Sequence, residues 1–249
     1  METPASIYAL LLSPFVGSFL GVVAIRAQAP ASILWGRSAC CTCRHVLGPV
    51  DLVPVFSWIS LRGHCRFCGA RVSTVYPILE IATVGVAAWS ASLLSGWWLW
   101  ASCLFGWMLL ALAVADLRYQ LLPDFLTLPL LAAGLGISAV FAPEEFASSL
   151  FGAGVGLGAI LLLRQTYWML RKREGIGLGD AKLLAGIGAW VTWGGLPSVV
   201  LIAAFVALAG VLLRRPGDGS LALSDRVPFG AFLCLGAWLV WLYGPLNVS

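Results

Sequence analysis

Apolar runs of about 20 residues recur along almost the whole chain and constrain its fold more than any other feature. A run of this length crosses the hydrocarbon core of a bilayer as one α-helix. Only 10% of the 249 residues are charged and 60% are hydrophobic. A soluble domain, by contrast, carries about 25% charged residues. The composition therefore predicts an all-α, polytopic integral membrane protein.

We predict about eight transmembrane helices, the first of which is retained. That first run, 7–25, has no basic segment before it and no small-residue cleavage site after it, so it does not fit a signal peptide. The helices 181–193 and 196–213 are separated only by Gly194-Gly195-Leu196-Pro197, where we expect the break. The predicted helices are 6–25, 75–95, 97–115, 124–142, 147–169, 181–193, 196–213 and 229–244.

The basic residues fall on one side of the membrane in this topology. The opposite loops hold Glu144 and Glu145 but no basic residue, and Arg164 and Lys182 lie near helix ends that face the basic side. The positive-inside rule makes the basic side cytoplasmic. The net charge of +4 then reflects orientation in the membrane, and we expect no nucleic-acid partner. The loops on the basic side are 26–74, 116–123, 170–180 and 214–228.

The polar segment 26–74 is too short to build a comfortable hydrophobic core of its own. It contains two Cys-x2-Cys pairs, Cys40 with Cys43 and Cys65 with Cys68, separated by 21 residues. This spacing is close to that of a four-thiolate zinc ribbon, in which each pair supplies two corners of a tetrahedron. A structural Zn²⁺ at these four cysteines would supply the folding energy that the lobe lacks. Unliganded or redox-active thiols are the alternative.

Three other residues near the cysteine pairs stay outside the predicted ligand set. His45 and His64 lie close by in the sequence, but a lone histidine beside such a site is more often a surface residue. Cys41 complicates the count, since it is adjacent to a predicted ligand and is able to replace it. Gly69 follows the second pair, at a position where a metal knuckle often needs a positive backbone angle.

Three aspartates lie at the ends of apolar runs. Asp116 ends the third run and Asp180 begins the sixth, so both lie at the predicted cytoplasmic edge. Asp116 is the stronger functional hint, because the dipole at a helix C-terminus disfavours an anion. Asp180 also fits a helix cap. For Asp124, which begins the fourth run, we favour a structural role: it caps its helix or interacts with the N-terminal dipole.

Two carboxylates held together at an interface do not both ionise easily, so one keeps a proton while the other acts as a base. Such a pair titrates as a unit and is able to activate water for attack on a peptide carbonyl. Proton or cation transport is the other common use of carboxylates in membranes. The chemistry of the two carboxylates alone supports a protease and a transporter about equally well. A transporter, however, would favour carboxylates nearer the middle of the membrane.

Short motifs follow one another along nearly the whole chain. They are Gly17-Ser18-Phe19-Leu20, Pro54-Val55-Phe56-Ser57-Trp58, Cys65-Arg66-Phe67-Cys68-Gly69, Tyr76-Pro77-Ile78-Leu79-Glu80, Leu121-Leu122-Pro123-Asp124, Gly177-Leu178-Gly179-Asp180 and Pro228-Phe229-Gly230. In this combination they resemble the motifs of the type IV prepilin peptidases, the Gly-x-Gly-Asp aspartic membrane proteases. The Gly-x-Gly-Asp motif alone is weak, but together with the first aspartate motif and the cysteine quartet it is highly specific.

The resemblance implies an enzyme of the bacterial inner membrane with two activities. It would cut type IV prepilins or pseudopilins after a glycine on the cytoplasmic side, with Asp116 and Asp180 as the catalytic pair. It would then N-methylate the new N-terminus from S-adenosyl-L-methionine. The expected partners are these precursors and membrane lipid. The expected division is a first helix at 1–25, a cytoplasmic zinc-binding and methyltransferase lobe at 26–74, and a peptidase domain at 75–249.

Some positions depart from the usual pattern of that family. Gly21, Ile176 and Ala231 stand where asparagine, methionine and proline are common. None of them touches the aspartate pair, so they bear on methylation more than on cleavage. No S-adenosylmethionine motif is visible, and the residues that bind this cofactor stay unassigned.

Overall fold

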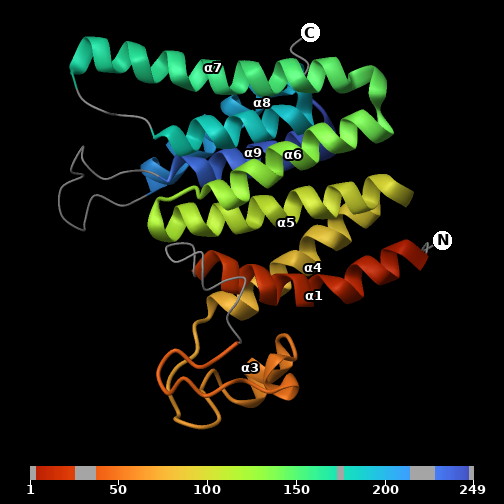
Figure 1. Ribbon diagram of the computed structural model, residues 1–249, viewed down its shortest axis with the longest axis vertical. Helices are drawn as coiled ribbons and strands as arrows, with labels where there is room; N and C mark the ends of the chain where they lie inside the picture. Colours follow the sequence, from red (N-terminus) through yellow and green to blue (C-terminus); the bar gives the residue numbers. More distant parts are fainter. Residues whose placement is uncertain (1–3, 26–37, 173–176, 214–227, 247–249) are drawn as a thin grey trace. The chain divides into compact units, whose positions relative to one another are not determined.

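The computed structural model describes residues 4–25, 38–172, 177–213 and 228–246 (Figure 1). These residues form helices and isolated bridges, with no β-strand among them. Six of the described helices are long and apolar enough to cross a membrane. The predicted all-α, polytopic membrane fold is therefore confirmed. Ile176, one of the positions that depart from the family pattern, lies outside the described residues.

The chain divides into two compact units, Met1–Ala111 and Leu112–Ser249. The first unit holds two membrane helices, a cysteine-rich lobe between them, and the first part of a third helix. Its elements are α1 (Pro4–Ile25), η1 (Pro49–Leu52), α3 (Phe56–Ser60), α4 (Val75–Leu93) and the beginning of α5 (Gly96–Tyr119).

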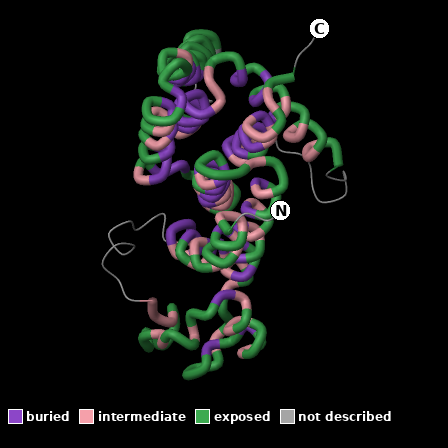
Figure 2. The backbone as a smooth tube through the Cα atoms, turned by 90° about the vertical axis from the view of Figure 1, so that its right-hand side faces the viewer, coloured by how far each residue is buried: buried purple, intermediate pink, exposed green. Residues whose placement is uncertain are grey.

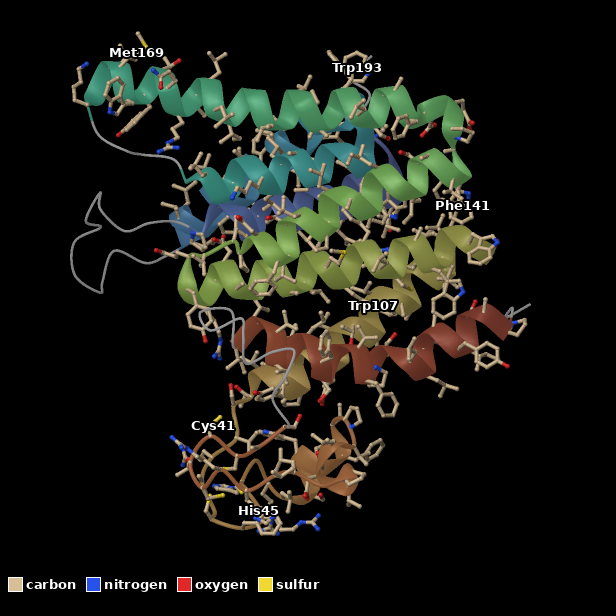
Figure 3. The ribbon with its side chains drawn as sticks, in the orientation of Figure 1. Cys41, His45, Trp107, Phe141, Met169 and Trp193 are labelled. Atoms are coloured by element: carbon tan, nitrogen blue, oxygen red, sulfur yellow. The ribbon has the colours of Figure 1, made fainter. Side chains whose placement is uncertain are left out.

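The close packing of α1 against α4 depends on a glycine. A Cβ atom added to Gly17 would lie 2.6 Å from the Cα atom of Glu80, so no larger residue fits between the two backbones. The contact is reinforced at Thr83, whose hydroxyl donates to the carbonyl oxygen of Ser13 over 2.8 Å. The indole N–H of Trp107 (Figure 3) donates to the carbonyl oxygen of Thr83 over 3.2 Å. Small residues and interhelical hydrogen bonds are the usual means of joining helices in lipid.

The second unit is a bundle in which α8 contacts α6, α7 and α9. The faces turned away from these contacts are exposed (Figure 2), as expected of helices that meet lipid. On α7, for example, Leu162 and Leu170 are 70% and 78% exposed. The elements are the end of α5, α6 (Asp124–Phe141), η2 (Pro143–Glu145), α7 (Phe146–Arg171), α8 (Leu178–Leu213) and α9 (Phe229–Tyr243).

The long element α8 is a helical hairpin. Thr192 has φ 59° and ψ 179°, outside the helical region, and both ends of α8 lie at the same end of the unit (Figure 1). Its 36 residues would extend about 54 Å if straight, well beyond a hydrocarbon core of about 30 Å. When the two arms of α8 are counted separately and the shorter apolar helix α9 is included, the described residues form eight apolar helical segments, in line with the approximate count that we predicted.

The predicted position of the break in α8 was wrong by two residues. Gly194 and Gly195 are helical, and the chain turns at Thr192 instead. A Cβ on Gly152 of α7 would lie 2.7 Å from the backbone nitrogen of Trp193. The Trp193 ring also meets Phe151 edge-on, with 6.3 Å between ring centroids (Figure 3). The turn at Thr192 is therefore packed closely against α7. A positive φ at a β-branched residue such as Thr192 is a backbone outlier.

Candidate active site and metal-binding cluster

Asp116 lies in the last turn of α5 and is only 5% exposed. The N–H of Gln120 donates to its carbonyl oxygen over 2.8 Å, which closes the helix. Its carboxylate oxygen Oδ2 accepts a hydrogen bond of 2.9 Å from the N–H of Ala231, in the first turn of α9. The carboxylate is therefore held between the end of one helix and the beginning of another. Our expectation that Ala231 does not touch the aspartate pair was wrong, because its backbone N–H, which any residue except proline provides, makes this contact.

Asp180 is the third residue of α8 and is half-buried. Leu122 connects it to Asp116, because this side chain contacts the first turns of both α8 and α9. A Cβ on Gly179 would lie 3.0 Å from Cβ of Leu122, and a Cβ on Gly230 would lie 3.0 Å from its Cδ1. The two carboxylates are close enough for direct electrostatic interaction. The structure thus brings together the pair that the sequence singled out.

This pair lies at one end of the second unit. The C-terminal end of α5 and the beginnings of α6, α8 and α9 meet there (Figure 1). One carboxylate is buried and held by a backbone donor, while the other is partly open to the surroundings. In this arrangement both carboxyl groups are able to reach one bound molecule. Their environments differ, so one is able to act as an acid and the other as a base.

Of the two structural roles that we considered for Asp124, a side-chain cap of α6 and an interaction with the helix dipole, the structure supports the second. The N-cap residue is Pro123, and Asp124 is the first residue of the helix, where its charge still favours the helix dipole. Its carboxylate oxygens lie 2.6 and 2.8 Å from Nζ of Lys182. Sequence reasoning missed this ion pair. The only available signal was that opposite charges occur near the beginnings of two helices.

The four predicted metal ligands form one cluster in the lobe. Their sulfur atoms all lie within 4.8 Å of one another, and Sγ of Cys40 is 3.7 Å from Sγ of Cys68. Tetrahedral zinc with Zn–S bonds of about 2.3 Å requires sulfur atoms about 3.8 Å apart. The donor set and its spacing therefore fit a metal ion such as Zn²⁺. The other members of the cluster are Cys43 and Cys65.

The two cysteine pairs have matching backbones. In each pair the N–H of the residue after the second cysteine donates over 3.0 Å to the carbonyl oxygen of the first, from Arg44 to Cys40 and from Gly69 to Cys65. Both donating residues have positive φ, 57° at Arg44 and 69° at Gly69. The positive angle predicted at Gly69 is confirmed, and Arg44 adopts the same conformation without being a glycine.

Cys41, His45 and His64 lie outside the four-sulfur cluster. Cys41 is exposed and is no member of the four-sulfur group (Figure 3). The His45 ring stacks on Phe67 at 3.6 Å between centroids, and Nδ1 of His64 is 2.7 Å from the carbonyl oxygen of Arg62.

The thiols of the cluster do not ionise alike. The backbone N–H groups of Cys43 and Thr42 lower the pKa of Cys40 to about 6. At Cys68 the N–H of Ala70 favours the thiolate, but desolvation and the neighbouring sulfur atoms outweigh it and raise the pKa to about 11. Four thiolates this close repel one another, so a dication is the natural partner that allows all four to ionise.

A buried carboxylate joins the lobe to the membrane part of the first unit. Glu80 of α4 is 5% exposed and accepts a hydrogen bond of 2.7 Å from the N–H of Val55. Val55 immediately precedes α3 and has φ 62°, an outlier for a β-branched residue. Sequence reasoning did not single out Glu80, although an acidic residue inside an apolar run was a usable signal.

Comparison with known proteins places the chain in a family. Residues 11–94 match the Bacterial Peptidase A24 N-terminal domain, and residues 103–212 match the Type IV leader peptidase family. The chain belongs to the type IV leader peptidase family. The aspartate pair and the hairpin α8 lie in the second matched region, apart from the last residue of the hairpin, and the cysteine cluster lies in the first.

Several relatives are similar over most of their length. The prepilin leader peptidase/N-methyltransferase of Aeromonas hydrophila is 37% identical over 87% of this chain and 75% of the relative. The enzyme of the same name from Burkholderia pseudomallei is 37% identical over 95% of this chain and 85% of the relative. That from Pseudomonas aeruginosa is 34% identical over 94% and 89%. No solved structure matches the chain.

The family decides between the two uses of membrane carboxylates that the sequence left open. The chain is a multi-pass membrane enzyme of the leader peptidase and N-methyltransferase type, and a transporter has no support.

Proposed function

We propose that Asp116 and Asp180 are the catalytic pair with which this enzyme cuts the leader from type IV prepilins or pseudopilins, after a glycine. The observation that carries the proposal is their convergence. Leu122 contacts the glycines beside both carboxylates, and the two groups come from helix ends that meet at one end of the second unit.

The chemistry follows from the different surroundings of the two groups. A carboxylate takes a proton from water as the water attacks the peptide carbonyl, while the second group, protonated, donates to the carbonyl oxygen. A substrate whose mature part begins with an apolar helix would insert that helix into the membrane. Its cleavage site would then lie at the interface, where the ends of α5 and α8 are.

The side on which the pair lies follows from charge. The loops that flank Asp116 and Asp180 carry basic residues, and we propose from the positive-inside rule that they face the cytoplasm. The same rule places the segment 26–74 on that side. We assign 1–25 as the first membrane helix, 26–74 as the zinc-binding lobe and 75–249 as the peptidase domain.

The cysteine cluster is proposed to hold one structural Zn²⁺. Its four sulfur donors would fix the two halves of the lobe to each other, since Cys40 and Cys43 come from one half and Cys65 and Cys68 from the other. S-adenosyl-L-methionine is the proposed methyl donor, and we assign methylation to the lobe without naming residues that bind the cofactor.

Incubation of the purified enzyme with a prepilin and labelled S-adenosyl-L-methionine tests both activities together. Wild type should yield a shortened, methylated product. Asp116→Asn and Asp180→Asn should each abolish cleavage, yet still methylate a pilin supplied already cut. Cleavage at the normal rate by either variant would show that the pair is wrongly assigned. A matched control is Gly136→Ala, since a Cβ at Gly136 of α6 meets no atom within 4 Å.

A further inference from the structure

The first turn of α9 lacks a cap from its own sequence. A helix begins with backbone N–H groups that have no partner inside the helix, and an N-cap side chain usually accepts from them. The N-cap of α9 is Pro228, which makes no side-chain hydrogen bond. The N–H groups of Gly230 and Ala231 instead point to Asp116, and that of Ala231 donates over 2.9 Å.

Gly230 leaves the space in which the carboxylate sits. A Cβ at this position would lie 2.9 Å from Oδ2 and 3.1 Å from Cγ of Asp116, and 3.0 Å from Cδ1 of Leu122. Both neighbours are buried, with Asp116 5% and Leu122 9% exposed, so there is no open space into which the added methyl group fits without moving them. A methyl group at Gly230 would therefore displace the carboxylate from the helix end.

The carboxylate of Asp180 lies in a different environment from that of Asp116. Among the residues that the structure describes, no hydrogen-bond donor contacts its carboxylate, although it is half-buried near the charge of Asp116. The titratable groups that face Asp116 from the packed helices are Asp180 of α8 and Cys234 of α9, which interact with it electrostatically. Lys182 is paired with Asp124. Backbone donors and a helix N-terminus favour the ionised form of the group they contact.

We propose that Gly230 and Ala231 are positioning residues that hold Asp116 as the ionised member of the pair, and that Asp180 keeps the shared proton. The inference rests on the proposed function of the pair and goes beyond it by giving each carboxylate a separate role.

With these roles for Asp116 and Asp180, every proton transferred during peptide hydrolysis has a donor and an acceptor. Asp116 takes a proton from water as the water oxygen bonds to the scissile carbonyl carbon, and the carbonyl oxygen takes the proton of Asp180. The carbon–nitrogen bond of the resulting diol then breaks. The leaving nitrogen takes the proton from Asp116, and one hydroxyl proton returns to Asp180, so both groups regain their starting states.

Steady-state cleavage by Gly230→Ala tests the positioning role in the full-length enzyme. We expect kcat to fall about 100-fold with KM unchanged, since a displacement of about 1 Å at a reacting group costs this much. Gly236→Ala is the matched control in the same helix, because its Cβ would meet the carbonyl oxygen of Val199 at 2.6 Å, a packing contact that involves neither carboxylate. It should lower thermal stability but keep the kcat of the folded enzyme.

A second pair of variants isolates the hydrogen bond. Ala231→Pro removes the N–H that donates to Asp116, and proline fits the first turn of a helix. It should lower kcat about tenfold, as expected for one hydrogen bond to a charged group. Ala231→Gly keeps the N–H and should keep the rate. Methylation of a pilin supplied already cut, together with thermal unfolding, shows whether each variant is folded.

The outcomes separate this inference from the assignment of the pair. If Asp116→Asn is inactive while Gly230→Ala and Ala231→Pro both cleave within twofold of wild type, the positioning role is overturned and the pair stands. Equal losses of kcat in Gly230→Ala and Gly236→Ala would also overturn it, because packing alone would explain them. Normal cleavage by Asp116→Asn would instead remove the proposed function.

Discussion

Lys182 and Asp124 form an ion pair that joins the beginnings of α8 and α6, with Nζ of Lys182 2.6 and 2.8 Å from the two carboxylate oxygens of Asp124. Lys182 is two residues from Asp180 on the same helix. The side chains are 37% and 58% exposed, and exposed ion pairs contribute only about 0.2–1 kcal/mol. The pair therefore orients the first turn of α8 more than it stabilises the fold.

Asp124→Asn should accordingly be mild. It removes the ion pair but leaves both carboxylates of the proposed catalytic pair in place, so we expect cleavage to fall by no more than about fivefold, the equivalent of about 1 kcal/mol. The measurement is the initial rate of prepilin cleavage at low salt and at high salt, where a screened contact matters less. A complete loss, as expected for Asp116→Asn, would show that Asp124 takes part in the chemistry.

Replacement of Gly179 by a β-branched residue should impair cleavage. The Cβ would lie 3.0 Å from Cβ of Leu122, and the added γ-methyl groups of Gly179→Val would push the first turn of α8 away from Leu122. Asp180 is the next residue, so its carboxylate would move with that turn, and we expect the rate to fall at least about tenfold.

The control for this substitution is Gly194→Val, because a Cβ at Gly194 meets no atom within 4 Å. Unchanged processing of a matched prepilin by a correctly inserted Gly179→Val enzyme would contradict the close contact between α8 and Leu122.

The proximity of Asp116 and Asp180 was predictable, whereas the contacts that arrange the two residues were not. Charged groups at the ends of apolar runs are visible in the sequence, because lipid makes them costly and therefore rare. The hydrogen bond from Ala231 to Asp116 and the ion pair of Lys182 with Asp124 join residues that are far apart in the chain. The turn at Thr192 depends on packing against α7, and local propensity instead favoured the glycines that follow it.

The link between Glu80 and Val55 should support the lobe. Glu80→Ala would leave the N–H of Val55 without the acceptor that it has at 2.7 Å, and an unmet polar group of this kind costs about 1–3 kcal/mol. Glu80→Gln keeps an acceptor oxygen and should be milder. Thermal unfolding of both variants in the same detergent measures the difference. Equal melting temperatures for wild type and Glu80→Ala would show that this hydrogen bond does not hold the lobe.

The cysteine cluster should carry about one zinc ion per chain, bound by four sulfur donors in a tetrahedron. Elemental analysis of the purified enzyme measures it, and Cys65→Ser should lose the metal because Cys65 is the buried member of the cluster. Cys41→Ser is the matched control, since Cys41 is exposed and outside the cluster.

Acid should release the metal, because zinc binds thiolates and protons compete for the same sulfur atoms. Metal retention should therefore decline as the pH falls. Removal of zinc by a chelator should unfold the lobe. The unfolding would be detected as faster proteolysis of the segment between the two cysteine pairs. Stoichiometric zinc in Cys65→Ser, or none in wild type, would remove the structural role proposed for the metal.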